Sequence, residues 1–337
     1  MNSLIFDDSV DPGYHAAVRH ALGAIACPEV TGHVEVSVLA GGGSNENFLV
    51  NVAGRRHSVL RLTAPESLSR RFRINRVSGL ESHLFAQAAG LTPELLGTTL
   101  PSGNSLTRFL DGRMVRTEQV EAGTTIEDCM AILRQTHRNG RCSQRFSAAA
   151  DIVAYAHLAA AEGLPTPADL PEMVEAALLI ERRFQDIRVP EVHCHNDATT
   201  ANFLRAEGRL WLLDWEYSGM GNPYFDLGNF VADADLGPVE ADRVLASYFG
   251  VVRECDRARL VAQRFVAALR EAIWAVVATP VLGEMQFDHV ARAADHFERA
   301  RRSLARFTRP GTADRMGSQP DDSAVFAACL GGVRTHT

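Results

Sequence analysis

The sequence predicts an α+β fold with two lobes, a small antiparallel sheet followed by a larger, mainly helical part. Three observations carry this prediction. Short apolar segments bounded by Gly and Asn fill the first third of the chain, which is typical of strands, and helical periodicity dominates after Gly112. The length of 337 residues also exceeds the usual size of about 100–200 residues for one domain. We therefore expect residues 1–110 to form the smaller lobe and residues 111–308 the larger one.

The individual elements follow from the apolar spacing within each segment. Apolar residues at helical spacing predict helices over 13–26, 77–89, 125–137, 148–161, 171–184, 242–248, 256–277 and 287–306. Alternating or continuous short apolar runs predict strands over 34–39, 48–52, 58–62 and 105–110, and a strand–turn–strand unit over 192–216. Residues 309–337 are rich in Pro, Gly, Asp and Ser without periodicity, so we expect a poorly ordered tail.

Composition excludes several kinds of partner. The chain is 46% hydrophobic and 22% charged, which suits a folded globular protein. Its net charge of -7 gives no general attraction for nucleic acid or anionic lipid. The longest apolar stretch, 267–282, is interrupted by Arg270, Glu271 and Pro280, and the six cysteines are scattered without CxxC pairs. We expect a cytoplasmic protein that binds neither nucleic acid nor a membrane and has no cysteine metal site.

The densest group of polar residues lies in the 192–216 unit. HNDATTAN contains Asp197 and Asn202, and an apolar strand then ends at Asp214. Asp197 follows an apolar run and sits in a predicted loop, where its carboxylate can accept a proton from a hydroxyl. The side-chain oxygens of Asn202 and Asp214 are the hard ligands that Mg²⁺ prefers. Because one hairpin-like unit carries all three, we expect them to converge, as phosphoryl transfer from ATP requires.

HNDATTAN followed by LLDWEYSGMGNPYFDLGNF resembles the catalytic and metal-binding stretch of bacterial choline kinases and, more loosely, of aminoglycoside phosphotransferases. The resemblance implies a protein-kinase-like bilobal fold with a small sheet lobe and a larger helical lobe. It implies that Asp197 is the catalytic base, that His195 positions the catalytic loop and that Asp226 supports it. It also implies that Asn202 and Asp214 hold Mg²⁺, with Glu216 as a second-metal or substrate carboxylate.

The smaller lobe carries the candidate nucleotide-binding residues. A glycine-rich segment between two predicted strands lets the backbone approach phosphates closely, and its candidates are Gly42, Gly43, Ser44, Asn45 and Asn47. In protein kinases, a strand lysine and a helix glutamate hold the α- and β-phosphates as a pair. VLRL resembles the choline kinase family, where Arg commonly takes the lysine's place, and GLESHLFA resembles its glutamate helix. This implies that Arg61 and Glu81 form the pair, although an alternative register would place the glutamate at Gly79.

One further segment belongs to the candidate site. Arg108, Phe109 and Leu110 lie where the sheet-rich part gives way to the helical part, and this stretch resembles the family's hinge, whose backbone contacts adenine. His137, at the end of a predicted helix, receives no catalytic role.

An amine acceptor would be held by carboxylates or by aromatic faces. Glu271 and Trp274 lie three positions apart on a predicted helix and therefore share a face. This region resembles the helix that helps wall the choline pocket, so Glu271, Trp274, Tyr217 and Glu216 are candidate substrate residues beside Asp197. Choline kinases tend to have a second aromatic residue where this chain has Glu271. The alternative of a core tryptophan with a solvated glutamate stays open.

Together these patterns predict an ATP- and Mg²⁺-dependent kinase that acts on a small hydroxylated amine such as choline or ethanolamine. One alternative is a phosphotransferase for aminoglycosides or other natural products, whose pocket should be acidic rather than aromatic. A second alternative is a non-catalytic binding protein on a kinase-like scaffold. Such a protein would most simply lack one of Asp197, Asn202 and Asp214, and all three are present.

Overall fold

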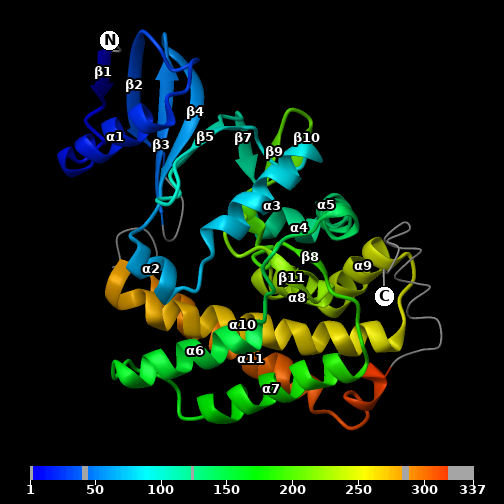
Figure 1. The fold of residues 1–337 in the computed structure, drawn as a ribbon. Helices are drawn as coiled ribbons and strands as arrows, with labels where there is room; N and C mark the ends of the chain where they lie inside the picture. The colour runs from blue at the N-terminus through cyan, green and yellow to red at the C-terminus, as the bar shows by residue number, and fades with distance from the viewer. Residues whose placement is uncertain (1–2, 40–44, 123–124, 283–287, 318–337) are drawn as a thin grey trace.

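The computed structural model describes residues 3–39, 45–122, 125–282 and 288–317 (Figure 1). It shows a small lobe built on a six-stranded sheet and a larger helical lobe, which confirms the predicted fold class. The candidate residues Gly42, Gly43 and Ser44 lie outside the described residues.

The smaller lobe has one sheet with the strand order β1-β2-β3-β4-β6-β5. Its strands are β1 (Ser3–Phe6), β2 (His33–Val38), β3 (Glu46–Val52), β4 (Arg55–Leu62), β5 (Leu95–Thr98) and β6 (Ser105–Arg108). Neighbouring strands are antiparallel except β1 and β2, so the predicted antiparallel sheet has one parallel edge strand. Alternate strand residues such as Val34 and Phe48 are buried in one core with Val18 of α1 (His15–Ile25), as a half-buried sheet requires.

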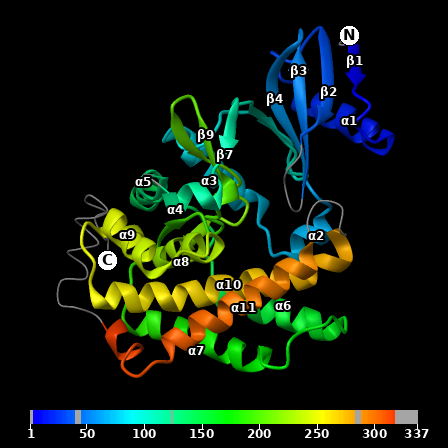
Figure 2. The same ribbon diagram turned by 180° about the vertical axis from the view of Figure 1, so that it is seen from behind.

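The larger lobe is organised around α10 (Glu254–Leu282). Its other helices are α4 (Thr117–Ala122), α5 (Thr125–Asn139), α6 (Ala148–Ala161), α7 (Leu170–Asp186), α8 (Pro223–Asp233), α9 (Pro238–Phe249) and α11 (His289–Phe307). Helices α6, α8 and α11 pack on α10 (Figure 2). By length and composition α10 could cross a membrane, but 67% of its apolar window is buried inside the protein, as expected of a core helix.

Two small sheets position the polar unit between the lobes. One has the order β10-β9-β7 and contains β7 (Gly112–Met114), β9 (Phe203–Ala206) and β10 (Arg209–Leu212). The other pairs β8 (Val192–Cys194) with β11 (Gly219–Gly221). The loops that leave β8 and β10 carry the polar residues of the predicted strand–turn–strand unit.

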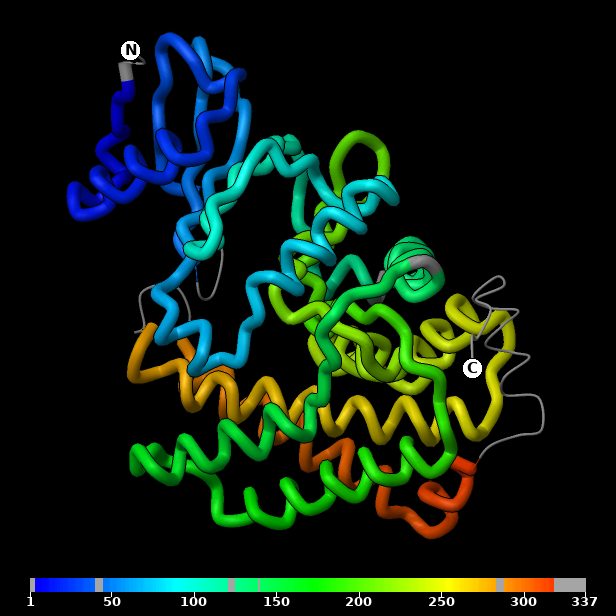
Figure 3. The backbone as a smooth tube through the Cα atoms, viewed as in Figure 1, coloured from blue at the N-terminus to red at the C-terminus, as the bar shows by residue number. Residues whose placement is uncertain are grey.

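Helices α2 (Glu66–Arg71) and α3 (Arg76–Ala88) follow β4 in the chain but pack with the larger lobe. The chain descends from β4 to α2 beside α10 and then rises through α3 (Figure 3). Phe72, Ala86 and Leu91 belong to the hydrophobic core of the larger lobe, whereas the core of the smaller lobe contains only residues before 63 and Leu106 among the described residues. The packing boundary therefore does not coincide with the expected boundary at residue 110.

The first part of the expected tail is ordered. A short 3₁₀ helix, Asp314–Met316, packs against α10, and Met316 is fully buried. The guanidinium of Arg259, itself buried, donates hydrogen bonds to the carbonyl oxygens of Met316 and Gly317. The expectation of a poorly ordered tail from residue 309 is thus wrong up to residue 317, because a buried charge needs those carbonyls as partners.

Candidate active site

Asp226 of α8 binds the backbone of the loop that follows β8, which carries the candidate catalytic residue Asp197. Asp226 is fully buried and accepts hydrogen bonds from the backbone N–H groups of His195, at 2.8 Å, and Asn196, at 2.7 Å. Asn196 has a φ of 63°, which the two bonds help to maintain. Asp226 therefore contacts the loop that, by the resemblance, it is expected to support.

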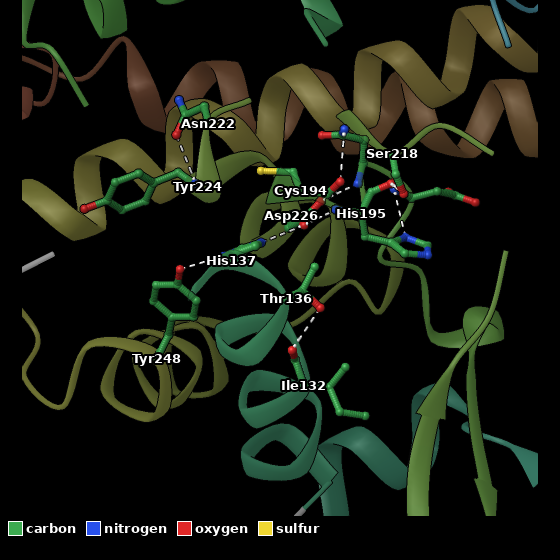
Figure 4. A network of polar contacts seen from close by, with 12 residues as sticks. Ile132, Thr136, His137, Cys194, His195, Ser218, Asn222, Tyr224, Asp226 and Tyr248 are labelled. Atoms are coloured by element: carbon green, nitrogen blue, oxygen red, sulfur yellow. Dashed lines mark hydrogen bonds and ion pairs between the residues drawn. The ribbon is translucent and has the colours of Figure 1, made fainter. Parts of the chain in front are cut away.

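His137 of α5 completes this support, and sequence reasoning missed it. Its Nε2 lies 2.8 Å from Asp226 Oδ2, and its Nδ1 lies 2.6 Å from the hydroxyl of Tyr248 (Figure 4). Burial alone would raise the pKa of Asp226, but the hydrogen bond and charge of His137 and the hydrogen bond from the His195 backbone hold it below its ordinary value. A single histidine at a helix end belongs to no short motif, so the contact appears only once α5 is packed against α9 and β8.

Asn202 orients Asp197 at the centre of the site. The Asn202 side-chain nitrogen donates to the backbone oxygen of Asp197 and to Asp197 Oδ2, both at 2.8 Å. This use of the nitrogen leaves the Asn202 side-chain oxygen as the atom available for a metal ion. Burial, together with the nearby charges of Glu271 and Asp214, raises the pKa of Asp197 to about 8.

His195 links Asp197 to the strand that precedes Asp214. Its Nε2 donates to the carbonyl oxygen of Leu213 at 2.8 Å, and its Nδ1 accepts from the backbone N–H of Asp197 at 3.3 Å. This pattern requires a neutral ring, and burial lowers the pKa of His195 accordingly. His195 thus lies where it fixes the loop rather than where it would meet a substrate.

Asp214 lies beside Asn202 and has one carboxylate oxygen without a partner. The Leu213 N–H donates to the Asn202 backbone oxygen at 2.9 Å, which brings the two candidate metal ligands together. Asp214 has a φ of 64°, and its Oδ1 is buried with no hydrogen-bond partner among the described residues. A buried, unsatisfied carboxylate oxygen fits a divalent cation such as Mg²⁺, and Asn202 could add an amide oxygen to it.

Arg61 of β4 pairs with this segment and not with Glu81. Its Nη2 lies 2.8 Å from Asp214 Oδ2 and 3.5 Å from Glu216 Oε2. Glu81 instead accepts hydrogen bonds from the backbone and hydroxyl of Ser143. The expected Arg61–Glu81 pair is therefore wrong in this structure.

The physical reason is the close approach of α3. A Cβ on Gly79 would lie 3.2 Å from the Glu216 Cα and 3.4 Å from the Trp215 oxygen, so α3 presents bare backbone to this segment. The alternative register at Gly79 thus marks the position that faces the site, where no side chain is available. Glu216 supplies the carboxylate instead, and it also accepts from Asn45 Nδ2 at 3.0 Å.

The remaining nucleotide candidates lie on the sheet edge of the site. Asn47 lies on β3 opposite Arg61 of β4. The backbone N–H groups of Arg108 and Phe109 donate to Glu94 and His57, at 2.8 and 3.0 Å. These two donors are therefore committed to the protein, and Leu110, buried in a small cluster with Trp211, is the hinge residue whose backbone remains a candidate for adenine.

The candidate acceptor residues form a connected group beside Asp197. Trp274 Nε1 donates to the hydroxyl of Tyr217 at 3.1 Å, and the Trp274 ring lies 5.5 Å from that of Phe72. Trp274 is half-buried, so it is not fully enclosed in the core. Glu271 and Tyr217 thus lie within electrostatic reach of Asp197, and Trp274 contacts Tyr217.

Glu271 is paired, not solvated. Arg292 of α11 donates from Nε to Glu271 Oε1 at 2.7 Å, and the Glu271 side chain is only 13% exposed. Burial would raise the pKa of Glu271, but the charges of Arg292 and His296 and the hydrogen bond from Arg292 lower it to about 2. The alternative of a solvated glutamate is therefore wrong, and no sequence pattern indicated the partner on α11.

The chain matches a known protein family and several known proteins. A model of the phosphotransferase enzyme family matches residues 35–261. Protein LicA of Haemophilus influenzae is 28% identical over 212 residues, which is 62% of this chain and 61% of that relative. The match thus spans about three fifths of the length of this curated relative.

Solved structures share the fold at low sequence identity. A choline/ethanolamine kinase family protein from Mesorhizobium loti has a TM-score of 0.70 at 23% identity, covering 94% of this chain and 99% of that one. Choline kinase LicA from Streptococcus pneumoniae has a TM-score of 0.66 at 21% identity, covering 80% and 94%. The aminoglycoside phosphotransferase APH(4)-Ia has a TM-score of 0.56 at 17% identity, covering 82% and 96%.

Proposed function

Because the chain belongs to the phosphotransferase enzyme family, we propose that it transfers the γ-phosphoryl group of ATP to the hydroxyl of a small amino alcohol such as choline or ethanolamine. The observation that carries this proposal is the convergence of Asp197, Asn202 and Asp214. A carboxylate that can accept a proton lies next to two oxygen ligands, one of them unsatisfied. Phosphoryl transfer needs this set and little covalent chemistry from the protein.

Each residue has a distinct part in this reaction. Asp197 receives the proton of the acceptor hydroxyl, while Asn202 keeps its carboxylate oriented. Asn202 and Asp214 would hold Mg²⁺, and Glu216 lies close enough to Arg61 to share in binding the phosphates or a second ion. A bound Mg²⁺ supplies positive charge that neutralises the phosphate oxygens and favours the ionised form of Asp197. Arg61 can turn its fork of donors from Asp214 to phosphate oxygens.

The acceptor residues support a small amine. Trp274 and Tyr217 offer aromatic faces, and Glu271 offers a carboxylate within the electrostatic reach of Asp197. Relatives described as choline or ethanolamine kinases share the fold. We therefore favour choline and ethanolamine as the first acceptors to test.

One observation favours the second candidate, a phosphotransferase for aminoglycosides. Glu271 takes the position where choline kinases tend to have an aromatic residue, and a carboxylate suits an amine with N–H donors better than a quaternary ammonium. Arg292 neutralises Glu271 in part, so the pocket is neither purely aromatic nor purely acidic.

The test is an activity panel with a matched inactive variant. Purified protein with Mg·ATP is offered choline, ethanolamine and a set of aminoglycosides, with phosphorylated product followed by ³¹P NMR. We expect turnover with a small amino alcohol, and a loss of about 10²–10⁴-fold in Asp197→Asn with Mg·ATP affinity unchanged within a few-fold. Turnover only with aminoglycosides would support the second candidate. Nucleotide binding without any turnover would instead indicate a non-catalytic binding protein.

A further inference from the structure

A polar cleft shares Glu216 and Tyr217 with the candidate active site, and its other lining residues have no part in the reaction proposed above. It opens between the α2–α3 connection, with Arg73 and Asn75, and the start of α6, with Ser147 and Asp151. Tyr217 forms one of its walls. The catalytic Asp197 and the acceptor residues Glu271 and Trp274 do not line it.

Asp151, one of the two carboxylates that line the cleft, is outnumbered by the guanidinium groups that contact it. Asp151 is shared between two guanidinium groups: Arg73 Nε lies 2.7 Å from its Oδ1, and Arg270 Nε lies 2.9 Å from its Oδ2. Arg270 is 2% exposed, and its Nη2 has no hydrogen-bond partner among the described residues. One carboxylate thus faces two permanent positive charges, one of which keeps an unsatisfied donor.

The guanidinium group of Arg270 lies close to two aromatic rings of the cleft. Its guanidinium carbon lies 4.4 Å from the centre of the Tyr217 ring and 5.2 Å from that of Phe146, and both rings line the cleft. The buried charge therefore lies directly behind the cleft wall, where low polarity strengthens its effect.

Two helices also direct their positive ends toward the cleft. Asn75 caps the N-terminus of α3, and Ser147 caps that of α6, and both cap residues line the cleft. Helix N-termini favour anions through their dipoles. Glu216, the other acidic residue in the lining, is already engaged by Arg61 and Asn45.

We propose that this cleft binds a small anionic group, a carboxylate or a phosphate, between Arg73 and the N-termini of α3 and α6. Arg73 is 46% exposed and has its Nε on Asp151, so its two terminal nitrogens can reach the ligand. Tyr217 is common to the cleft wall and to the Trp274 contact, so an occupied cleft steadies one residue of the acceptor group. The anion is either a separate ligand or part of an acceptor, and only the latter case rests on the proposed function.

The first experiment measures binding of inorganic phosphate and of acetate to the nucleotide-free protein by calorimetry and thermal denaturation, at ionic strength held constant with NaCl. We expect binding by the unchanged protein and by Arg70→Gln, a control in which an arginine 78% exposed on α2 is neutralised. Arg73→Gln should weaken binding at least about tenfold, since it removes a charge-assisted contact. Asn75→Asp should weaken it similarly by adding a negative charge, while an aspartate still caps α3.

Phosphate could also bind in the nucleotide site. The variants therefore distinguish binding in the cleft from binding there. Unchanged phosphate and acetate affinity in both Arg73→Gln and Asn75→Asp would place the anion elsewhere and overturn the proposal, as would no binding at all.

A second comparison uses ethanolamine and serine, which differ by one carboxylate. Tighter binding of serine that disappears in Arg73→Gln identifies the anion as part of the acceptor. Equal binding of the two, with phosphate still bound, identifies a separate ligand. Neither measurement needs turnover, so failure of the kinase assay leaves this test intact.

Discussion

Asp197 is a half-buried carboxyl whose ionisation opposes folding. Burial and the charges of Glu271 and Asp214 raise its pKa from 3.8 to about 8, so the folded protein holds a proton that the unfolded chain releases. The sign follows: between about pH 4 and pH 8 this group makes the protein less stable as the pH rises. Asp197→Asn removes the ionisation while keeping the shape of the side chain.

We therefore predict that Asp197→Asn stabilises the metal-free protein against urea, by more at about pH 8.5 than at about pH 5. Asp111→Asn, at a side chain 87% exposed, serves as the control and should show a change of less than about 0.5 kcal/mol at both values. An equal effect of Asp197→Asn at the two pH values would mean that Asp197 is already ionised in the folded protein.

The unsatisfied oxygen of Asp214 gives a second prediction. Asp214→Ala should abolish the extra thermal stabilisation that Mg²⁺ adds to ATP, because Asp214 would supply the charged ligand for the ion. Glu81→Ala is the matched control, since Glu81 bonds only Ser143 in the described structure and should leave the Mg·ATP response unchanged. A full Mg·ATP response in Asp214→Ala would remove Asp214 from the metal site.

The catalytic hairpin could be predicted from sequence because its residues are close in the chain. Asp197, Asn202 and Asp214 all lie in the loops that follow β8 and β10. The hydrogen bond from the Leu213 N–H to the Asn202 carbonyl oxygen holds these loops together. The partners contributed by helices could not be predicted. His137 meets Asp226 across 89 residues, and a periodic pattern states that a helix has a buried face without stating which residue that face meets.

Helix α10 shows the same limit and supplies the third prediction. Its spacing placed Glu271 and Trp274 on one face, but the Arg292 partner depends on how α11 packs. Trp274→Ala should raise the KM for the acceptor and leave the KM for ATP nearly unchanged, because Trp274 belongs to the proposed acceptor group with Tyr217 and not to the nucleotide candidates. Trp274→Phe keeps a ring in place and should have a smaller effect.

Glu271→Gln tests the chemistry of the acceptor on the same helix. It should raise the KM more for ethanolamine, which can donate hydrogen bonds to a carboxylate, than for choline, which cannot. Arg292→Gln is the control for loss of the ion pair itself, since it removes the partner but keeps the Glu271 carboxylate. If Glu271→Gln and Trp274→Ala left every acceptor KM unaltered, the acceptor would bind elsewhere.

The two lobes could be predicted from the change after Gly112 from short strand-like segments to helical periodicity. The packing of α2 and α3 with the larger lobe could not be predicted in this way. These helices come before the expected boundary but share the core of the larger lobe. The N-terminal sheet has a separate core, built from β1–β4, β6 and α1. Chain order alone cannot reveal this, because a helix inserted between two strands of one sheet can pack on either lobe.

The connection of α2 to the larger lobe rests on Arg71. Its two terminal nitrogens each lie 2.6 Å from a Glu162 oxygen, and its Nε donates to the carbonyl oxygen of Val277 at 2.9 Å. These contacts join α2 to α6 and α10 at once, and the Arg71 side chain is only 13% exposed. Truncation would leave the Val277 carbonyl without this donor and Glu162 without its partner.

We predict that Arg71→Ala lowers the free energy of unfolding by about 1–3 kcal/mol, the range for losing partly buried hydrogen bonds to charged groups. The neighbouring Arg70→Ala is a close control, because Arg70 is 78% exposed and its side chain pairs only with Glu66 among the described residues. Its loss should cost less than about 1 kcal/mol, as for exposed ion pairs. Urea denaturation of the two variants measures both values. If they were equal, Arg71 would be an ordinary surface residue, and α2 would be held to the larger lobe by its apolar contacts alone.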